Sequence, residues 1–139
     1  MDHLEVNEHV GPLNRPEVDQ DFTGTAEING WGYLANILHA VDSITLQAVT
    51  IPFVDYETCK KPYQELYGDV FREDCMICAG SKGKGDCYGD IGGPLVCQDK
   101  EKGQVLCGMS SWGEGCGKEE YPSVYARVSH MVDFINENL

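Results

Sequence analysis

The sequence Gly85-Asp86-Cys87-Tyr88-Gly89-Asp90-Ile91-Gly92-Gly93-Pro94-Leu95-Val96-Cys97 begins as a glycine-rich loop and ends in an apolar run. Glycine adopts backbone angles that other residues avoid, so residues 80–93 are predicted to form a loop rather than a helix or strand. Short apolar segments follow at 94–98, 104–112 and 122–128. The charged connector between the first two is typical of a hairpin. This part of the chain is therefore predicted to be antiparallel β-structure.

Two further strands are expected before this loop. One is predicted near residues 23–28. The other covers residues 43–54, where Pro52 is expected to end the strand and alternate apolar residues share one face, namely Ile44, Leu46 and Ala48. A set of short strands in this arrangement indicates an all-β, antiparallel fold.

Two helices are predicted as well. Residues 55–67 have the composition of a short helix that Asp55 begins and Pro62 interrupts. Residues 129–139 have apolar side chains at helical spacing, and Ser129 is suited to be the N-cap. The expected fold is therefore an antiparallel β-domain closed by a C-terminal helix.

Length and charge exclude several classes of function. The chain has 139 residues, with 10 Lys and Arg against 23 Asp and Glu, and a formal net charge of −13. This length fits a single domain. Nucleic acids and anionic membranes attract basic surfaces, so neither is expected as a partner. No apolar run approaches the ~18 residues of a membrane span, and the polar start does not resemble a signal peptide.

The seven cysteines indicate an oxidising compartment and a disulfide framework. Because seven is odd, at least one thiol has no partner within the chain. The segment Cys75-Met76-Ile77-Cys78 has the C-x-x-C spacing of a zinc site, but no second such pair follows it. Disulfides are therefore favoured over zinc, and neither a metal site nor a cofactor is predicted.

Five motifs, in order, resemble those of trypsin-like serine proteases. Residues 85–94 resemble the family's GDSGGP loop, which holds its nucleophilic serine. The other four resemble the family's S/T-G-W-G, C…M-x-C-A-G, S-W-G-x-G-C and Y-P-G-V-Y-x-x-V motifs, and they lie here at 29–32, at 59 with 78–80, at 111–116 and at 121–128. The family fold has two six-stranded β-barrels, and the resemblance covers the second barrel.

This resemblance divides the chain into three parts. Residues 1–28 are expected to form an acidic crossover segment and the first strand, residues 29–128 the barrel, and residues 129–139 the C-terminal helix. Nothing in the chain resembles the family's first barrel.

The same resemblance predicts that the catalytic residues are absent. The family uses a serine nucleophile, a histidine base and an aspartate that orients the histidine. Ile91 stands where the family has serine, and its side chain has no atom that can attack a carbonyl group. The family's histidine and aspartate come from the first barrel. No histidine here has the family's A-A-H-C context, whether His3, His9, His39 or His130.

The remnant oxyanion loop is assigned to Gly89, Asp90 and Ile91. The resemblance implies that the backbone N–H groups of Gly89 and Ile91 are the oxyanion donors. In the family, the aspartate equivalent to Asp90 pairs with an N-terminal amine of the first barrel. Burying an unpaired charge costs several kcal/mol, so without this amine Asp90 is expected to be solvated and the loop to stay open.

The remnant specificity pocket is assigned to six residues: Gly85, Asp86, Ser111, Trp112, Gly113 and Ser123. In trypsin-type enzymes an aspartate that selects basic side chains occupies the position of Gly85, one residue before Asp86. Asp86 either favours a basic side chain or faces the solvent. Ser123 replaces a glycine of the pocket wall and is expected to narrow the pocket.

The resemblance also implies the disulfides. By family position Cys59 pairs with Cys78 and Cys87 with Cys116. The usual partner of Cys97 would stand at Ala26, so a cross-strand Cys97–Cys107 bridge is expected to replace that disulfide. Cys75 is left over, either as a free thiol or joined to another chain.

Three hypotheses about function follow. In the first, the chain is an inactive family member that acts as a binding or regulatory module. Its partner would be a protein or peptide at the remnant cleft or the uncovered barrel face, or a second copy. In the alternative, the chain is a fragment of a secreted serine endopeptidase that hydrolyses peptide bonds when complete. The third, in which the chain complements a separate first barrel, is disfavoured by Ile91.

Overall fold

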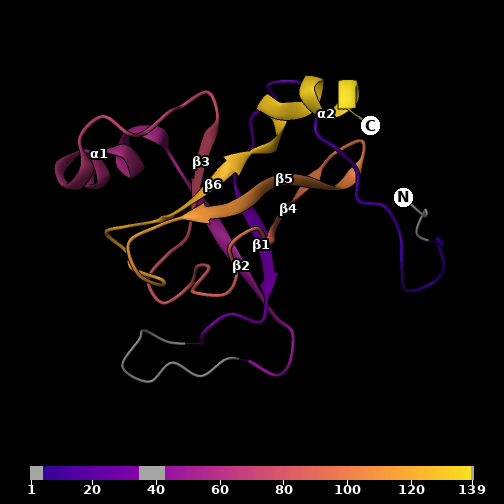
Figure 1. Cartoon of the computed structure of the whole chain (residues 1–139), viewed down its shortest axis with the longest axis horizontal. Helices are drawn as coiled ribbons and strands as arrows, with labels where there is room; N and C mark the ends of the chain where they lie inside the picture. Colours follow the sequence, from indigo (N-terminus) through magenta and orange to yellow (C-terminus); the bar gives the residue numbers. More distant parts are fainter. Residues whose placement is uncertain (1–4, 35–42, 139) are drawn as a thin grey trace.

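The computed structural model describes residues 5–34 and 43–138. Six antiparallel strands close into a barrel in the order β1-β2-β3-β6-β5-β4 (Figure 1). The strands are β1 (Thr25–Gly30), β2 (Gln47–Val54), β3 (Met76–Ala79), β4 (Pro94–Asp99), β5 (Gly103–Trp112) and β6 (Ser123–Arg127). The predicted six-stranded barrel is confirmed, and β4 pairs with β5 across the expected 99–103 hairpin.

Three helical segments lie outside the barrel wall: α1 (Tyr56–Tyr67), the short 3₁₀ helix η2 (Val128–Met131) and α2 (Val132–Asn138). Asp55 caps α1 as expected, because its carboxylate accepts the Thr58 N–H. The prediction that Pro62 interrupts this helix is wrong. The helix continues past Pro62 because its inner face is anchored by the Cys59–Cys78 disulfide and the fully buried Tyr63.

Ser129 is not the N-cap of the C-terminal helix. The helical path begins earlier as η2, and Ser129 lies inside it, fully buried. Its hydroxyl oxygen accepts a hydrogen bond from Nε of Arg127, which occupies the preceding cap position. The expected helix is present, but its first turn is a tighter 3₁₀ turn.

The structure corrects the predicted faces of β2. The core-facing residues are Val49, Ile51 and Phe53, whereas Ile44 lies before the strand and is 99% exposed. Pro52 does not end the strand, which runs to Val54. A proline fits there because only its N–H is missing, and its carbonyl still accepts the Gly80 N–H. A shift of one residue sends each side chain to the opposite face of a strand.

The buried apolar residues form two clusters. One fills the barrel and includes Ile51, Leu95 and Val105. The other lies between α1 and the outer side of the barrel and includes Tyr63, Phe71 and Val124. Phe22, Phe53 and Ile77 border the first cluster, and Val54, Tyr56 and Met76 border the second.

Candidate functional site

The glycine-rich loop at residues 85–93 is attached to the barrel at both ends. The Gly92 N–H donates to the Ser110 carbonyl at 2.8 Å, and the Ser110 N–H donates to the Gly93 carbonyl at 2.9 Å. At the other end, Cys87 forms a disulfide with Cys116. Ile91 is left at the outer side of this loop with 70% of its surface exposed.

The expectation that Asp90 is a solvated carboxylate is wrong. Asp90 is half-buried, and its carboxylate accepts the Gly32 N–H at 2.7 Å and the Cys87 N–H at 3.1 Å. A carboxylate is stabilised by backbone donors as well as by a cationic partner. Two backbone N–H groups therefore hold this aspartate without an N-terminal amine.

Glycine is required next to this carboxylate. A Cβ atom at Gly32 would lie 2.5 Å from the carboxylate carbon of Asp90, and one at Gly30 would lie 2.7 Å from it. Both distances are shorter than real Cβ contacts. The Gly-Trp-Gly motif thus leaves space for the Asp90 side chain, a role that sequence reasoning did not assign to it.

The N–H groups of Gly89 and Ile91 donate no hydrogen bond to the residues that the structure describes. Gly89 reaches its position through a left-handed backbone angle, with φ of 97°, which is open to glycine at little cost. These two N–H groups, on either side of Asp90 in the sequence, are available to donate hydrogen bonds to a carbonyl or carboxylate oxygen of a ligand.

Asp86 is buried, so the alternative in which it faces the solvent is wrong. Only 9% of its surface is exposed, and the Ser110 hydroxyl donates a short hydrogen bond to its carboxylate. Burial raises the pKa of Asp86, while the hydroxyl groups of Ser110 and Ser123 act in the opposite direction. That Asp86 favours a basic side chain stays a prediction.

A cavity of about 200 Å³ lies behind this loop. Both Asp86 and Asp90 line it, together with apolar residues of β1, β2 and β4. The fully buried Tyr125 also lines it, and its hydroxyl has no hydrogen-bond partner among the described residues. Burial, followed by the negative charge of Asp86, raises the pKa of Tyr125. Sequence reasoning missed Tyr125, although it lies within a quoted motif.

Gly85 and Asp86 line this cavity, and the other four predicted pocket residues are not part of its lining, namely Ser111, Trp112, Gly113 and Ser123. Ser123 nevertheless lies beside Gly85 and Gly113, because a Cβ atom at Gly85 would lie 3.1 Å from its hydroxyl oxygen and one at Gly113 would lie 3.6 Å from its Cα. That the six residues form a specificity pocket stays a prediction. Trp112 instead packs edge-on against Tyr63, with ring centroids 4.8 Å apart. The Tyr63 hydroxyl donates to the Pro122 carbonyl at 2.7 Å, and burial raises the pKa of Tyr63 to about 12.

The described histidines lie elsewhere. His9 is exposed beside Glu8, and His130 lies 3.7 Å from a carboxylate oxygen of Asp19. Neither lines the cavity behind the loop. The remaining two, His3 and His39, fall outside the described residues.

The three disulfides have the predicted partners: Cys59–Cys78, Cys87–Cys116 and Cys97–Cys107. Ala26 is the cross-strand neighbour of Cys97 in β1, so no thiol faces Cys97 from that side. Cys75 is a free, half-buried cysteine, and burial raises the pKa of its thiol.

No group of three or more His, Cys, Asp or Glu side chains among the described residues is placed to hold a metal ion. No helix within 5–34 and 43–138 has the length and apolar character that crossing a membrane requires.

Comparison with known proteins agrees with this geometry. The profile of the Trypsin family matches residues 2–135. The chain belongs to the trypsin family. Among curated trypsin-family relatives, mannan-binding lectin serine protease 1 of Homo sapiens is 41% identical over 133 residues. Trypsin-1 of Astacus astacus is 39% identical over 137 residues, and tryptase of Mus musculus 34% over 140.

The chain covers only part of these trypsin-family relatives. The matches span 94–97% of this chain, but 55% of Trypsin-1, 50% of tryptase and 18% of mannan-binding lectin serine protease 1. One β-barrel is described here, with three disulfides.

Proposed function

We propose that this chain is a trypsin-family barrel that does not hydrolyse peptide bonds and that acts by binding. The observation that carries the proposal is Ile91, which stands at the family's nucleophile position on the exposed side of the loop. An isoleucine side chain has no lone pair with which to attack a carbonyl group. The described histidines, His9 and His130, lie away from the loop cavity and do not supply a base.

Restoring the serine tests this proposal. The Ile91→Ser variant should hydrolyse an activated ester no faster than the matched Ile91→Ala variant, because a serine without a base stays un-ionised at neutral pH. A rise of more than ~10²-fold, the lower end of general-base catalysis, would contradict the proposal. Retention of the three disulfides in both variants is the control for folding.

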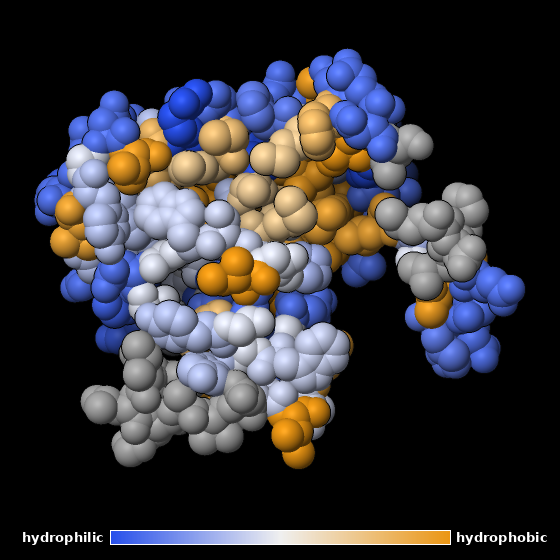
Figure 2. All heavy atoms as spheres, in the orientation of Figure 1, coloured by the Kyte–Doolittle hydropathy of each residue, from blue (hydrophilic) through white to orange (hydrophobic). Residues whose placement is uncertain are grey.

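The proposed binding surface includes the loop and the barrel wall beside it. Figure 2 shows apolar atoms gathered over β4 and β5, with hydrophilic atoms mainly around the margin. Ile91, Tyr88 and Met109 are exposed large side chains on the loop and β5. Monomers rarely leave a contiguous apolar patch beyond a few hundred Å² uncovered, so this face should bind a protein or peptide, or a second copy.

Sedimentation at micromolar concentration tests whether this apolar face binds a second copy of the chain. Self-association, or binding of a hydrophobic dye at this face, is expected despite the repulsion from a charge of −13. A monomer that unfolds in one step and binds no dye would contradict an uncovered apolar face.

A second candidate is that the chain forms half of a larger, secreted serine endopeptidase. The observation in its favour is the pair of unpaired N–H groups at Gly89 and Ile91, which matches an oxyanion site. The disulfides and the relatives named as proteases support secretion. Reading the transcript upstream of Met1 tests this candidate, which requires an in-frame A-A-H-C segment there.

A further inference from the structure

A second cavity, of about 210 Å³, lies at the seam between the two apolar clusters. It is bordered by Phe22 and Phe53 of the barrel cluster and by Tyr56 and Phe71 of the outer cluster. It shares no lining residue with the cavity behind the loop. The side chains of the two clusters do not fill this space, so a cavity remains where the clusters meet.

The walls of this seam cavity are suited to an aromatic ring. Phe22 and Phe53 form a stacked pair with ring centroids 6.4 Å apart, and Tyr56 meets Phe71 edge-on at 5.5 Å. Further rings pack favourably against such pairs at centroid distances of about 4.5–7 Å. Cavities of about 150 Å³ can hold a benzene ring, so the seam cavity has room for a phenyl side chain.

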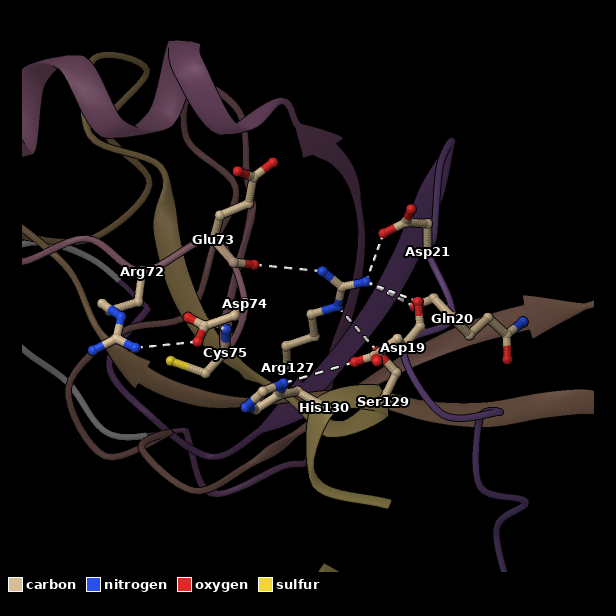
Figure 3. Close-up of polar contacts among 10 residues, drawn as sticks. All are labelled: Asp19, Gln20, Asp21, Arg72, Glu73, Asp74, Cys75, Arg127, Ser129 and His130. Carbon is tan, nitrogen blue, oxygen red and sulfur yellow. Dashed lines mark hydrogen bonds and ion pairs between the residues drawn. The ribbon is translucent and has the colours of Figure 1, made fainter. Parts of the chain in front are cut away.

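Among the described residues, Arg127 is the cation of the cavity lining, and it already has several partners (Figure 3). Its guanidinium donates to the Asp19, Gln20 and Glu73 carbonyl oxygens and to the Ser129 hydroxyl oxygen. Its strongest partner is the Asp21 carboxylate, at 2.6 Å. Arg127 therefore holds the crossover segment and the 70–75 loop together, and its charge is paired with Asp21.

The carboxylates of the rim outnumber this cation. Asp21, Asp55 and Glu73 line the cavity opening. The Glu73 carboxylate makes no hydrogen bond or ion pair with the described residues, and it points away from Arg127 in Figure 3. A shallow groove continues from the cavity through shared residues and adds Asp69 and Asp74, which pair with Lys60 and Arg72 of the same groove. The uncompensated carboxylate that a cationic group beside an inserted ring would find is therefore that of Glu73.

We propose that the seam cavity is a docking site for a peptide segment that inserts one aromatic side chain and places a basic residue beside Glu73. The ring contributes by burial against the four aromatic side chains. The basic residue contributes charge complementarity with the rim and fixes the direction of the segment. This site is independent of the function proposed above, because it uses neither the loop nor Ile91.

The test uses acetyl-Arg-Phe-Arg-amide as the probe and the methyl NMR signals of Met76 and Ile77 as the readout, because both side chains line the cavity. Titration to millimolar concentration should shift both signals saturably. Acetyl-Arg-Ala-Arg-amide, which lacks the ring, and acetyl-Glu-Phe-Glu-amide, which reverses the charge, should each bind at least about tenfold more weakly, since ring burial and opposite charge are both needed.

Two variants that each remove one negative charge distinguish an effect of the rim carboxylate from an effect of the net charge of the chain. Glu73→Gln should weaken binding about two- to fivefold, the usual effect of an exposed ion pair. Glu57→Gln, on the exposed side of α1 and outside the cavity lining, should leave binding unchanged. Three results would overturn the proposal: no shift with the first probe, equal shifts with all three, or shifts that depend on protein concentration alone, which would identify a second copy as the occupant.

Discussion

The contact between Asp90 and Gly32 predicts a strong energetic coupling between two positions 58 residues apart. Gly32→Ala adds a methyl group whose three nearest neighbours are all atoms of the Asp90 side chain. The backbone angle at Gly32 is not left-handed, so alanine is otherwise allowed there. The substitution therefore acts on the carboxylate alone, which must move and release the N–H groups of Gly32 and Cys87.

The magnitude follows from these two hydrogen bonds. Bonds to a charged group contribute about 1.5–3 kcal/mol each, so displacing the carboxylate should cost ~3 kcal/mol when water replaces part of the loss. In an Asp90→Ala background the added methyl meets no carboxylate. There Gly32→Ala should be neutral, or stabilising by about 0.4–1 kcal/mol through the unfolded chain. The expected coupling energy is therefore ~3 kcal/mol, the upper end for residues in contact.

Urea unfolding of the native chain, both single variants and the double variant measures this coupling, with the disulfides intact and the slope of each transition compared. Gly11→Ala is the control, because a Cβ atom at Gly11 meets nothing within 4 Å; it should change stability by less than about 0.5 kcal/mol. If Gly32→Ala costs the same free energy with and without Asp90, the described docking of the carboxylate is wrong.

Two further predictions concern titratable groups. Asp86→Asn should remove a pH dependence of the folding stability. Burial holds the pKa of Asp86 in the folded chain above its unfolded value of about 3.9. The protonated carboxyl group therefore contributes its full stabilisation below about pH 3.9, and this contribution is lost as the pH rises through the folded pKa. Urea midpoints of the native chain should therefore fall relative to the variant as the pH rises above about 4, and parallel curves would contradict this. Non-reducing peptide mapping should recover Cys59–Cys78, Cys87–Cys116 and Cys97–Cys107. Cys75 should be alkylated, but more slowly at neutral pH than an ordinary exposed thiol, because burial raises its pKa and the thiolate is the reactive form. A peptide that joins Cys75 to Cys97 or Cys107 would refute this pairing.

The hairpin at residues 94–112 could be predicted because its information is local, whereas the closed barrel was expected from the resemblance to trypsin-like proteases. The segments expected at 94–98 and 104–112 correspond to β4 (Pro94–Asp99) and β5 (Gly103–Trp112), each within one residue at either end. Their short apolar runs and the charged turn between them indicate a hairpin without help from the rest of the chain.

The faces of β2 could not be read in the same way. Apolar residues occur at both even and odd positions between Ile44 and Phe53, so alternation alone does not choose a face. Pairing with β1 and β3 in the closed barrel makes the choice, and it buries Ile51 while leaving Ile44 in solvent. Such long-range contacts leave no signal in a short window of sequence.

The candidate site, like the fold, could be predicted from the sequence only in part. Its residue types were visible in the motifs, but the partners of Asp90 are backbone N–H groups, which every residue except proline possesses and which therefore carry no sequence signature. The Gly-x-Gly spacing at Gly30 and Gly32 was the available signal, because it indicates a close approach of another group. The burial of Asp86 beside Ser110 depends on the fold of β5 against the loop and had no local sign.

The central claim is that this chain has no serine nucleophile that works in peptide hydrolysis. The most direct measurement is the intact mass of the purified chain after exposure to excess fluorophosphonate, with an active trypsin-family protease treated in parallel. Loss of a catalytic triad as a unit costs about 10⁶ in turnover, so the chain should keep its unmodified mass while the protease is labelled completely. Stoichiometric labelling of the chain at any serine would contradict the account.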